Sequence, residues 1–491
     1  MYNPRQKVLW FSIISRACVL TLQFIFNLVI PDHKADAFVS PLDPLEQVSI
    51  YDRAVDVCLG GLIRWDAQYF IHIAKYGYTF ENTLAFFPLY PLCVRYLAMI
   101  MGKVFFMLNN HSIIVLAAVS LNYFCFVKSA LILYDLSKHV LKSTNLAYKA
   151  AILYCMNPAS IFFSAAYSES MFAYVTFYSM LGSLELLRFV YIPIGLSALV
   201  RSNGLVNIGF PIFMWLHQWL KYVLPKIILE YRNSVKKSFS VGAVHTMYDF
   251  LNTLNTIFLS LIPFVFFQIY VYLLFCTEYN LEVLIPPHVE SFAVKNHLQI
   301  PSNNSFTWCQ GTFPIAYSNI QKKYWNVGFM KYYEFKQIPN FLLASPILYI
   351  MLKCIYQYLV NWKEFLYYFL GMEGKESERI AKAGQLPVET FVFVIHALFL
   401  TIFSILFIHI QVSTRFLASA SPLLYWYCAT ILSYRRNSSK EFEESCNLNS
   451  KWRVFLLLQE SYTLSDRLII LYFLGYIVLG CAMYSNFLPW T

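Results

Sequence analysis

Residues 8–30 read VLWFSIISRACVLTLQFIFNLVI, an apolar run in which Arg16 is the only charged residue. Its length matches the roughly 20 residues that an α-helix needs to cross the hydrocarbon core of a bilayer. The run is long for a signal peptide, Arg16 interrupts it, and no small-residue cleavage site follows it. We therefore expect a retained membrane-spanning helix, with the basic N-terminal residues 1–7 in the cytosol.

The composition extends this expectation to the whole chain. Of its 491 residues, 58% are hydrophobic and 13% are charged, whereas a soluble domain carries about 25% charged residues. Backbone groups in lipid must be paired within a helix or a closed barrel. The sequence thus predicts a single all-α polytopic membrane domain, residues 1–491, with about 10–12 transmembrane helices. Further apolar runs lie at 87–108, 113–136, 150–163, 171–187, 191–219, 253–275, 338–351, 391–410, 416–432 and 468–488.

Two long polar segments, 31–85 and 276–337, separate these runs. We expect both to be lumenal, because 31–85 follows the first helix and 276–337 contains a glycosylation sequon at Asn303. The basic loops 220–250, 359–386 and 435–467 are expected in the cytosol, since cytosolic loops are enriched in lysine and arginine. This distribution accounts for the net charge of +10 without nucleic-acid binding. The side of residues 109–165 stays open, because loop 137–149 is basic whereas simple alternation places it in the lumen.

The eleven cysteines show neither a CxxC motif nor a Cys/His ligand spacing. We therefore predict no zinc site and no disulfide framework. A single lumenal disulfide through Cys58 or Cys309 stays open.

The first polar segment ends in an unusual concentration of polar and aromatic residues, RWDAQYFIH at 64–72. A carboxylate beside an aromatic ring, next to a helix end, can accept a proton from a hydroxyl nucleophile in a pocket of low dielectric constant. Asp66 is the candidate for this role. The alternative is an interfacial Trp65 followed by a solvated aspartate. The other acids of the segment lack such neighbours: Asp43, Glu46, Asp52 and Asp56.

Three further charged residues interrupt apolar sequence. Glu169 lies in the polar break 167–170, and a charge at membrane depth indicates a functional site, although an ordinary turn also fits. Arg201 lies within the run 191–219, which is either one kinked helix or two short ones; it is a candidate to bind phosphate through paired donors or to extend to the interface. Arg415 is a candidate either to bind a phosphate or to cap the C-terminal end of a helix. His396 and His409 are expected to be core residues.

Several motifs, in this order, resemble one family. They are WDAQ (65–68), AFFP (85–88), NPAS (157–160), YSES (167–170), RSNGL (201–205), YWNVGF (324–329), KYYE (331–334) and TRFL (414–417). Together they resemble the PIG-V family, the second GPI mannosyltransferases, which have GT-C glycosyltransferase architecture. The resemblance extends from the first helix to about residue 430, and 435–465 resembles nothing that we can place.

The resemblance implies an α-1,6-mannosyltransferase that adds the second mannose to the glycosylphosphatidylinositol (GPI) precursor. The donor would be dolichol-phosphate-mannose, transfer would proceed by one inverting displacement, and the site would face the lumen of the endoplasmic reticulum. Asp66 would orient or deprotonate the acceptor hydroxyl, and Arg201 and Arg415 would stabilise the leaving phosphate. The residues that the resemblance places at the substrates are Trp65, Gln68, Tyr69, His72, Tyr167, Glu169, Arg201, Asn203, Tyr324, Trp325, Lys331, Tyr332, Tyr333, Glu334 and Arg415.

The expected partners are membrane lipids and the two lipid-linked substrates. No cofactor is expected. Asp66 has no second acid in an Asp-x-Asp arrangement, and a tightly held metal needs several oxygen ligands, so we expect metal-independent transfer.

Two other functions compete with this interpretation. Polar breaks at membrane depth also suit a lipid or solute transporter or a scramblase, although such a protein predicts inverted repeats that the sequence does not contain. A non-catalytic subunit of a lipid-linked sugar transferase is the second alternative.

Overall fold

The computed structural model describes residues 3–225, 236–277, 285–301, 306–311, 314–369, 385–433 and 462–490. All regular secondary structure in these ranges is helical, and they contain no strand. Within the same ranges, six helices are long and apolar enough to cross a membrane: 4–29, 110–141, 247–276, 335–363, 388–406 and 464–485. The predicted all-α polytopic class is therefore confirmed. The sequon at Asn303 and most of loop 435–467 lie outside the described residues.

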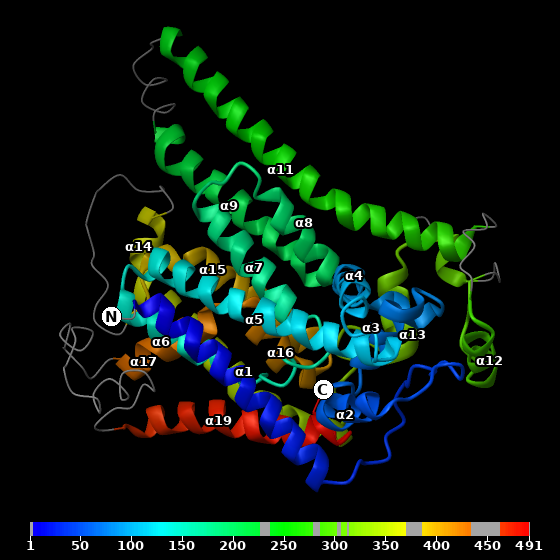
Figure 1. Ribbon diagram of the computed structural model, residues 1–491. Helices are drawn as coiled ribbons and strands as arrows, with labels where there is room; N and C mark the ends of the chain where they lie inside the picture. The colour runs from blue at the N-terminus through cyan, green and yellow to red at the C-terminus, as the bar shows by residue number, and fades with distance from the viewer. Residues whose placement is uncertain are drawn as a thin grey trace.

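Shorter helices lie between the long ones (Figure 1). The α-helices are α1 (Pro4–Val29), α2 (Ile50–Leu59), α3 (Ala67–Tyr76), α4 (Leu89–Gly102), α5 (Asn110–Leu141), α6 (Thr144–Cys155), α7 (Glu169–Leu184), α8 (Tyr191–Val200), α9 (Gly209–Gln218), α11 (Lys236–Cys276), α12 (Pro287–Lys295), α13 (Ala316–Trp325), α14 (Ile338–Phe369), α15 (Phe391–Leu406), α16 (Ser413–Ala420), α17 (Leu423–Ser433) and α19 (Leu464–Ser485). The 3-10 helices used below are η2 (Glu81–Ala85), η3 (Ser202–Ile208), η5 (Thr307–Gln310) and η8 (Ile410–Val412).

Helices α1 and α5 lie side by side and run in opposite directions. The Nε atom of Arg5, in the first turn of α1, lies 3.1 Å from a carboxylate oxygen of Asp135 near the end of α5. The connection between α5 and α6 is therefore on the same side as the N-terminus, which agrees with its basic character. The predicted loop 137–149 is mostly helical, because α5 continues to Leu141 and α6 begins at Thr144.

The charge within the first apolar run has a structural partner. Arg16 is fully buried, and its guanidinium donates to the carbonyls of Ser160 at 2.8 Å and Cys155 at 3.2 Å. Because α6 ends at Cys155, its last carbonyls lack helical partners. Arg16 supplies donors to this end and to the irregular segment that follows, which leads to Glu169 at the start of α7.

The run 191–219 forms two short helices, the second of the two alternatives. Helix α8 ends at Val200 and α9 begins at Gly209, with η3 between them. Gly204 allows this arrangement because a Cβ there would collide with the backbone of Ser197 and Ala198 on α8. The break exposes Arg201, at the end of α8, to the interior of the helical bundle.

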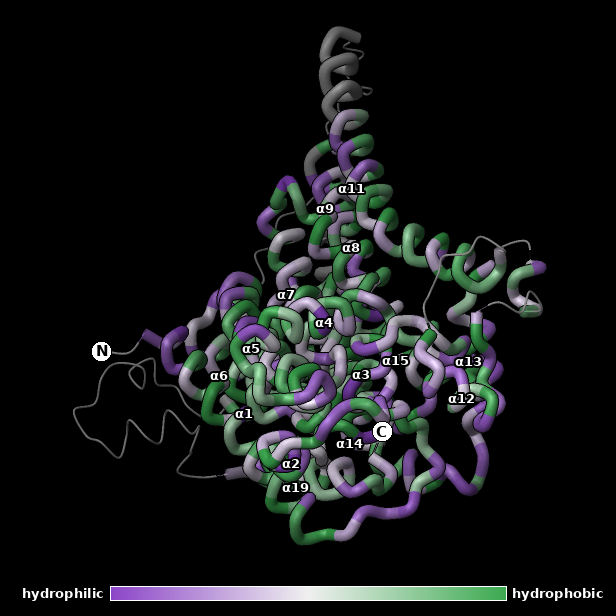
Figure 2. The backbone as a smooth tube through the Cα atoms, turned by 45° about the vertical axis from the view of Figure 1, so that its right-hand side comes forward, coloured by the Kyte–Doolittle hydropathy of each residue, from purple (hydrophilic) through white to green (hydrophobic). Residues whose placement is uncertain are grey.

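The two long polar segments are largely structured, and their helices α2, α3, α12 and α13 gather at one end of the molecule (Figure 1). Hydrophilic residues are frequent around α12 and α13 (Figure 2). A disulfide joins Cys276, at the end of α11, to Cys309 in η5. One of the two cysteines left open by the sequence is thus paired, whereas Cys58 is free.

Candidate active site

A cavity of about 770 Å³ lies where the first polar segment meets the broken helices. Its walls come from the start of α3, the breaks around α7 and α8, and from α13, α15 and α16. Many of the residues predicted from sequence meet here. Those that line the cavity are Trp65, Asp66, Tyr69, Glu169, Arg201, Asn203, Trp325 and Arg415.

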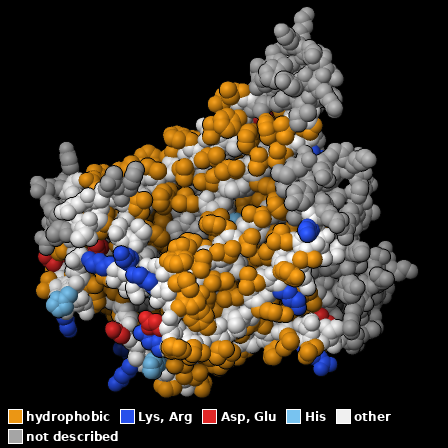
Figure 3. Space-filling view, turned by 180° about the vertical axis from the view of Figure 1, so that it is seen from behind, with side chains coloured by type: hydrophobic (Ala, Val, Ile, Leu, Met, Phe, Trp, Pro, Cys, Tyr) orange, Lys and Arg blue, Asp and Glu red, His pale blue; other side chains and the backbone are white. Residues whose placement is uncertain are grey.

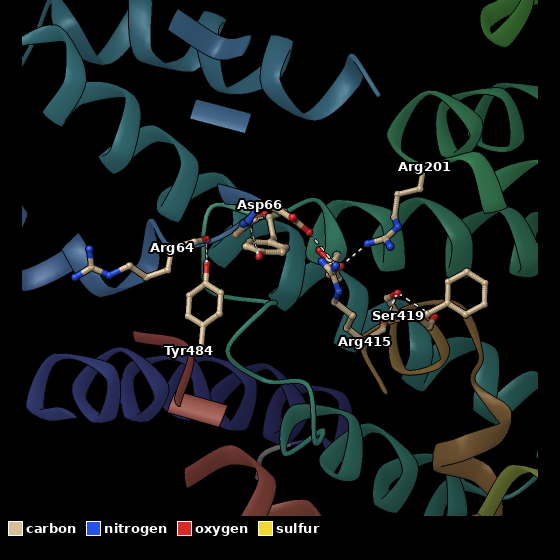
Figure 4. A network of polar contacts seen from close by, with 10 residues as sticks. Arg64, Asp66, Arg201, Arg415, Ser419 and Tyr484 are labelled. Atoms are coloured by element: carbon tan, nitrogen blue, oxygen red, sulfur yellow. Dashed lines mark hydrogen bonds and ion pairs between the residues drawn. The ribbon is translucent and has the colours of Figure 1, made fainter. Parts of the chain in front are cut away.

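Asp66 is held at the cavity by the turn that precedes α3. Trp65 has a φ of 55°, a left-handed conformation that is uncommon for a residue with a side chain. The backbone N–H of Asp66 donates to the hydroxyl of Tyr167 at 3.1 Å. From α19, Tyr484 donates to the carbonyl of Arg64 at 2.9 Å (Figure 4). Contacts from distant parts of the chain therefore stabilise the turn that presents the carboxylate.

Four charged side chains form a continuous chain across the cavity (Figure 4). Arg415 Nη2 lies 2.9 Å from Asp66 Oδ2, and Arg415 Nη1 lies 3.4 Å from Glu169 Oε1. Arg201 forms an ion pair with the same oxygen of Glu169. Two cations and two carboxylates thus neutralise one another, which a largely buried group of charges requires.

Aromatic rings support this chain of charges. The guanidinium of Arg415 lies 5.2 Å from the ring centres of both Phe162 and Tyr167, a distance suited to cation–π attraction. Arg415 is therefore fixed by ion pairs at its end and by rings along its faces. Its contact with Asp66 Oδ2 leaves the Asp66 side chain 26% exposed.

Several polar atoms around the cavity remain available for a ligand. Within the described residues, Glu169 Oε2, Asn203 Nδ2 and Trp65 Nε1 are buried and have no hydrogen-bond partner. Buried polar groups without partners are rare in folded proteins. A bound molecule with hydroxyl groups would supply both the acceptors and the donor that these atoms lack.

A stack of aromatic rings forms another wall. Tyr69 lies between Phe38, with ring centres 4.3 Å apart, and Phe86, with ring centres 4.5 Å apart. Trp325 from α13 meets the edge of Tyr69 at 5.9 Å. Burial, together with the charge of Asp66, raises the pKa of Tyr69, so its hydroxyl stays neutral. The stack is a flat apolar surface next to the carboxylate.

Two of the residues predicted at the substrates in the RWDAQYFIH stretch, Gln68 and His72, do not line the cavity. The side chain of Gln68 links the carbonyl of Ile63 to the backbone N–H of Ser40. The ring of His72 lies between the hydroxyls of Ser40 at 3.0 Å and Thr79 at 2.7 Å. Burial, and to a lesser extent the charge of Lys75, lowers the pKa of His72 to about 3, so the imidazole is neutral. Both side chains join parts of the first polar segment to one another.

Other predicted residues lie behind or beside the wall. Tyr167 accepts from the backbone N–H of Asp66, and Tyr332 of the second polar segment donates to Gln411 at 2.9 Å. The remaining side chains of that segment bind partners outside the cavity lining: Tyr324 binds Glu81, Lys331 binds Asn326, Tyr333 binds the carbonyl of Ile405, and Glu334 pairs with Lys336.

Sequence reasoning missed Glu81, which is 1% exposed. Its carboxylate accepts from Trp308 Nε1 at 3.1 Å and from the Tyr324 hydroxyl at 2.7 Å, and it pairs with Lys323 at 2.5 Å. Glu81 thereby joins η2 to η5 and α13, the helix that carries Trp325. Nothing in the sequence around Glu81 predicts this role, because a single acid in a polar segment is expected to be exposed to water.

His409 was expected in the core and instead lines the cavity. Its ring stacks on Tyr332, with centres 4.5 Å apart. The position immediately after α15 explains the difference, because the helix ends at Leu406 and the chain turns toward α16.

Within the described residues, no group of three or more His, Cys, Asp or Glu side chains could hold a metal ion. Three acids line the cavity, Asp36, Asp66 and Glu169, and the last two are both in contact with Arg415. Metal-independent transfer stays a prediction.

Comparisons with known proteins agree with the motifs. The family model described as mannosyltransferase (PIG-V) matches residues 5–491. The chain is 36% identical to the human GPI alpha-1,6-mannosyltransferase 2, over 99% of both chains. It is 34% identical to the Drosophila melanogaster GPI mannosyltransferase 2, over 99% of this chain and 100% of that protein. The oligosaccharyltransferase of Archaeoglobus fulgidus is a distant structural neighbour, with 13% identity and a TM-score of 0.42 over 97% of this chain and 56% of that one. The full-length matches establish that this chain belongs to the PIG-V family of mannosyltransferases.

Proposed function

We propose that this protein transfers mannose from dolichol-phosphate-mannose, in α-1,6 linkage, onto the first mannose of the GPI precursor. The names of its relatives, and their full-length coverage, support this transfer reaction. The observation that carries the mechanism is the Asp66–Arg415–Glu169–Arg201 chain of charges in the cavity wall. It combines a partly exposed carboxylate with two guanidinium groups, as transfer from a sugar phosphate requires. The GT-C architecture is part of this proposal.

The reaction is a single displacement at the anomeric carbon of the donor mannose. The 6-hydroxyl oxygen of the acceptor forms the new bond to C1, while the bond from C1 to the phosphate oxygen breaks and its electron pair leaves with dolichol phosphate. Asp66 accepts the hydroxyl proton. Because Arg415 holds Oδ2 of Asp66, we assign the other oxygen, Oδ1, to the acceptor. Attack opposite the leaving group inverts the configuration.

The two arginines then have different roles. Arg415 is 9% exposed and contacts both carboxylates, so it mainly orients Asp66 and Glu169. Arg201 is 19% exposed and pairs with Glu169 alone. We therefore assign Arg201 to the negative charge that develops on the phosphate, a form of transition-state stabilisation. The unpartnered donor of Asn203, two residues further on, suits a second phosphate or sugar oxygen.

The proposed location is the membrane of the endoplasmic reticulum. We propose that the N-terminus lies in the cytosol and that the first polar segment, which follows α1 and carries Asp66, lies in the lumen. The disulfide Cys276–Cys309 supports this side for the second polar segment, because disulfides persist in oxidising compartments.

The test is rescue of GPI-anchored surface proteins in cells that lack the second GPI mannosyltransferase, together with transfer assays in their membranes. Wild type should restore transfer, and Asp66→Asn at equal expression should lower it by about 10²–10⁴-fold, the range for a general base. Asp56→Asn is the matched control, because Asp56 is an exposed acid of the same polar segment and does not line the cavity.

Normal transfer by Asp66→Asn would contradict the role of Asp66 as the proton acceptor, but it would not contradict the proposed mannose transfer. Failure of the wild-type chain to transfer mannose would favour a transporter or a non-catalytic subunit.

A further inference from the structure

Three phenylalanines form a row along one wall of the cavity. Phe399 and Phe403 are one turn apart on α15, and Phe407 directly follows the last residue of that helix. Their ring centres are 6.1 and 5.2 Å apart along the row. All three line the cavity, and they are 51%, 37% and 38% exposed. We call these residues the phenylalanine ladder.

The ladder borders an apolar outer face of α15. Helix α15 is among the helices long and apolar enough to cross a bilayer. Ile395 and Ile402, each about one helical turn from Phe399, are 42% and 45% exposed and do not line the cavity. Figure 3 shows one face of the molecule on which hydrophobic side chains predominate. Eight residue steps separate Phe399 from Phe407, which corresponds to about 12 Å of regular helix. At the far end, η8 leads directly into α16, which carries Arg415.

We propose that the phenylalanine ladder binds the isoprenoid chain of the mannose donor, which enters the cavity sideways from the bilayer. This proposal rests on the proposed function, since it assumes a lipid-linked donor. The ladder and the charge chain line the same cavity, so an apolar chain and an attached phosphate can be bound together there. The apolar residues Val200 and Val206, from α8 and η3, complete this part of the lining.

The chemistry of the two substrates decides which lipid fits. In the donor, the isoprenoid chain begins at the phosphate ester itself, so the lipid must lie next to the guanidinium groups that bind phosphate. In the acceptor, the reacting hydroxyl is separated from the lipid by sugar residues and a phosphate. An apolar wall in the same cavity as Arg201 and Arg415 therefore suits the donor, and the lipid of the acceptor would lie further from the cavity.

The experiment compares neighbouring residues of α15. Ile402 is 45% exposed on the same helix but does not line the cavity, which makes Ile402→Ser a matched control for Phe403→Ser. We expect Phe403→Ser to raise the KM for dolichol-phosphate-mannose about fivefold, from the loss of part of a buried ring. The KM for the GPI precursor should be unchanged, and Ile402→Ser should behave as wild type in both.

A second measurement does not depend on transfer. A photoreactive isoprenyl phosphate without mannose should label full-length protein in membranes, and less so after Phe399→Ser together with Phe403→Ser. A raised KM for the acceptor instead of the donor, or equal effects of Phe403→Ser and Ile402→Ser, would overturn the assignment. A wild-type chain that takes the photoprobe but transfers no mannose would contradict the proposed function and leave the ladder in place.

Discussion

Replacing Glu81 should detach the second polar segment from the cavity wall without altering any residue that lines the cavity. Glu81→Ala removes the acceptor of Trp308 and Tyr324 and the partner of Lys323. Trp308 is 4% exposed, so its N–H would lose its acceptor in a dry environment, at a cost of about 1–3 kcal/mol. The Lys323 side chain is 47% exposed and would regain water, so its pair adds at most about 1 kcal/mol.

Together with the lost bond from Tyr324, these contributions amount to about 2–5 kcal/mol. Since 1.4 kcal/mol is a factor of ten, the docked state of α13 should become at least about 30-fold less favoured. Trp325, at the end of α13, would then leave the aromatic wall. We expect a large loss in kcat/KM and faster cleavage of residues 285–325 by protease in opened microsomes.

Two further variants separate the loss of the Glu81 hydrogen bonds from the loss of a charge elsewhere in the molecule. Glu81→Gln keeps one oxygen as the acceptor for Trp308 and places an NH2 group where the Tyr324 hydroxyl can accept from it instead of donating. It loses the charge that pairs with Lys323, so its effect should be smaller than that of alanine. Glu334→Gln is the control, because Glu334 lies in the same segment and pairs with the exposed Lys336. Wild-type kinetics and wild-type proteolysis in Glu81→Ala would refute the argument that this carboxylate positions the wall.

Further predictions concern the site and its supports. Gly204→Ala should abolish most transfer, because its Cβ would collide with the backbone of Ser197 and displace Arg201; thermal stability and kcat should both fall. Arg415→Lys should lower kcat by about 100-fold, since an ammonium cannot contact Asp66 and Glu169 at once; normal kcat would contradict the orienting role. Burial lowers the pKa of His72 to about 3, so below pH ~6.5 the unfolded chain binds a proton that the native state does not. The unfolding free energy should thus fall by up to about 2 kcal/mol between pH 7 and pH 5, measured as Tm in detergent, and a flatter profile is expected for His72→Gln.

The membrane helices were predictable because their signal is local. An apolar run such as 8–30 must pair its backbone groups within itself once it lies in lipid, and α1 follows that run closely. Interruptions were harder to interpret. The sequence left two alternatives for 191–219, and the two-helix form depends on Gly204 lying against Ser197. The end of α6 at Cys155 likewise depends on donors from Arg16, which lies 139 residues away in sequence.

The candidate site was predictable as a set of residues and not as an arrangement. Asp66, Glu169, Arg201 and Arg415 stood out because charge is rare in this chain and each interrupts apolar or aromatic sequence. Their mutual neutralisation was not predictable, since the Asp66–Arg415 contact joins positions 349 residues apart. Glu81 and the phenylalanine ladder gave no signal at all: one is an ordinary acid in a polar segment, and the other consists of ordinary residues in an apolar helix.

The sequence by itself thus determined that the chain is a helical membrane protein, which of its charged residues are candidates for a functional site, and which family its motifs resemble. Hydropathy and charge determine these properties locally, because each segment meets lipid or water on its own. Only the tertiary structure decided which carboxylate faces which cation, which predicted residues support loops, and which residues line the cavity. Those properties depend on contacts between segments distant in sequence, which residue patterns along the chain do not encode.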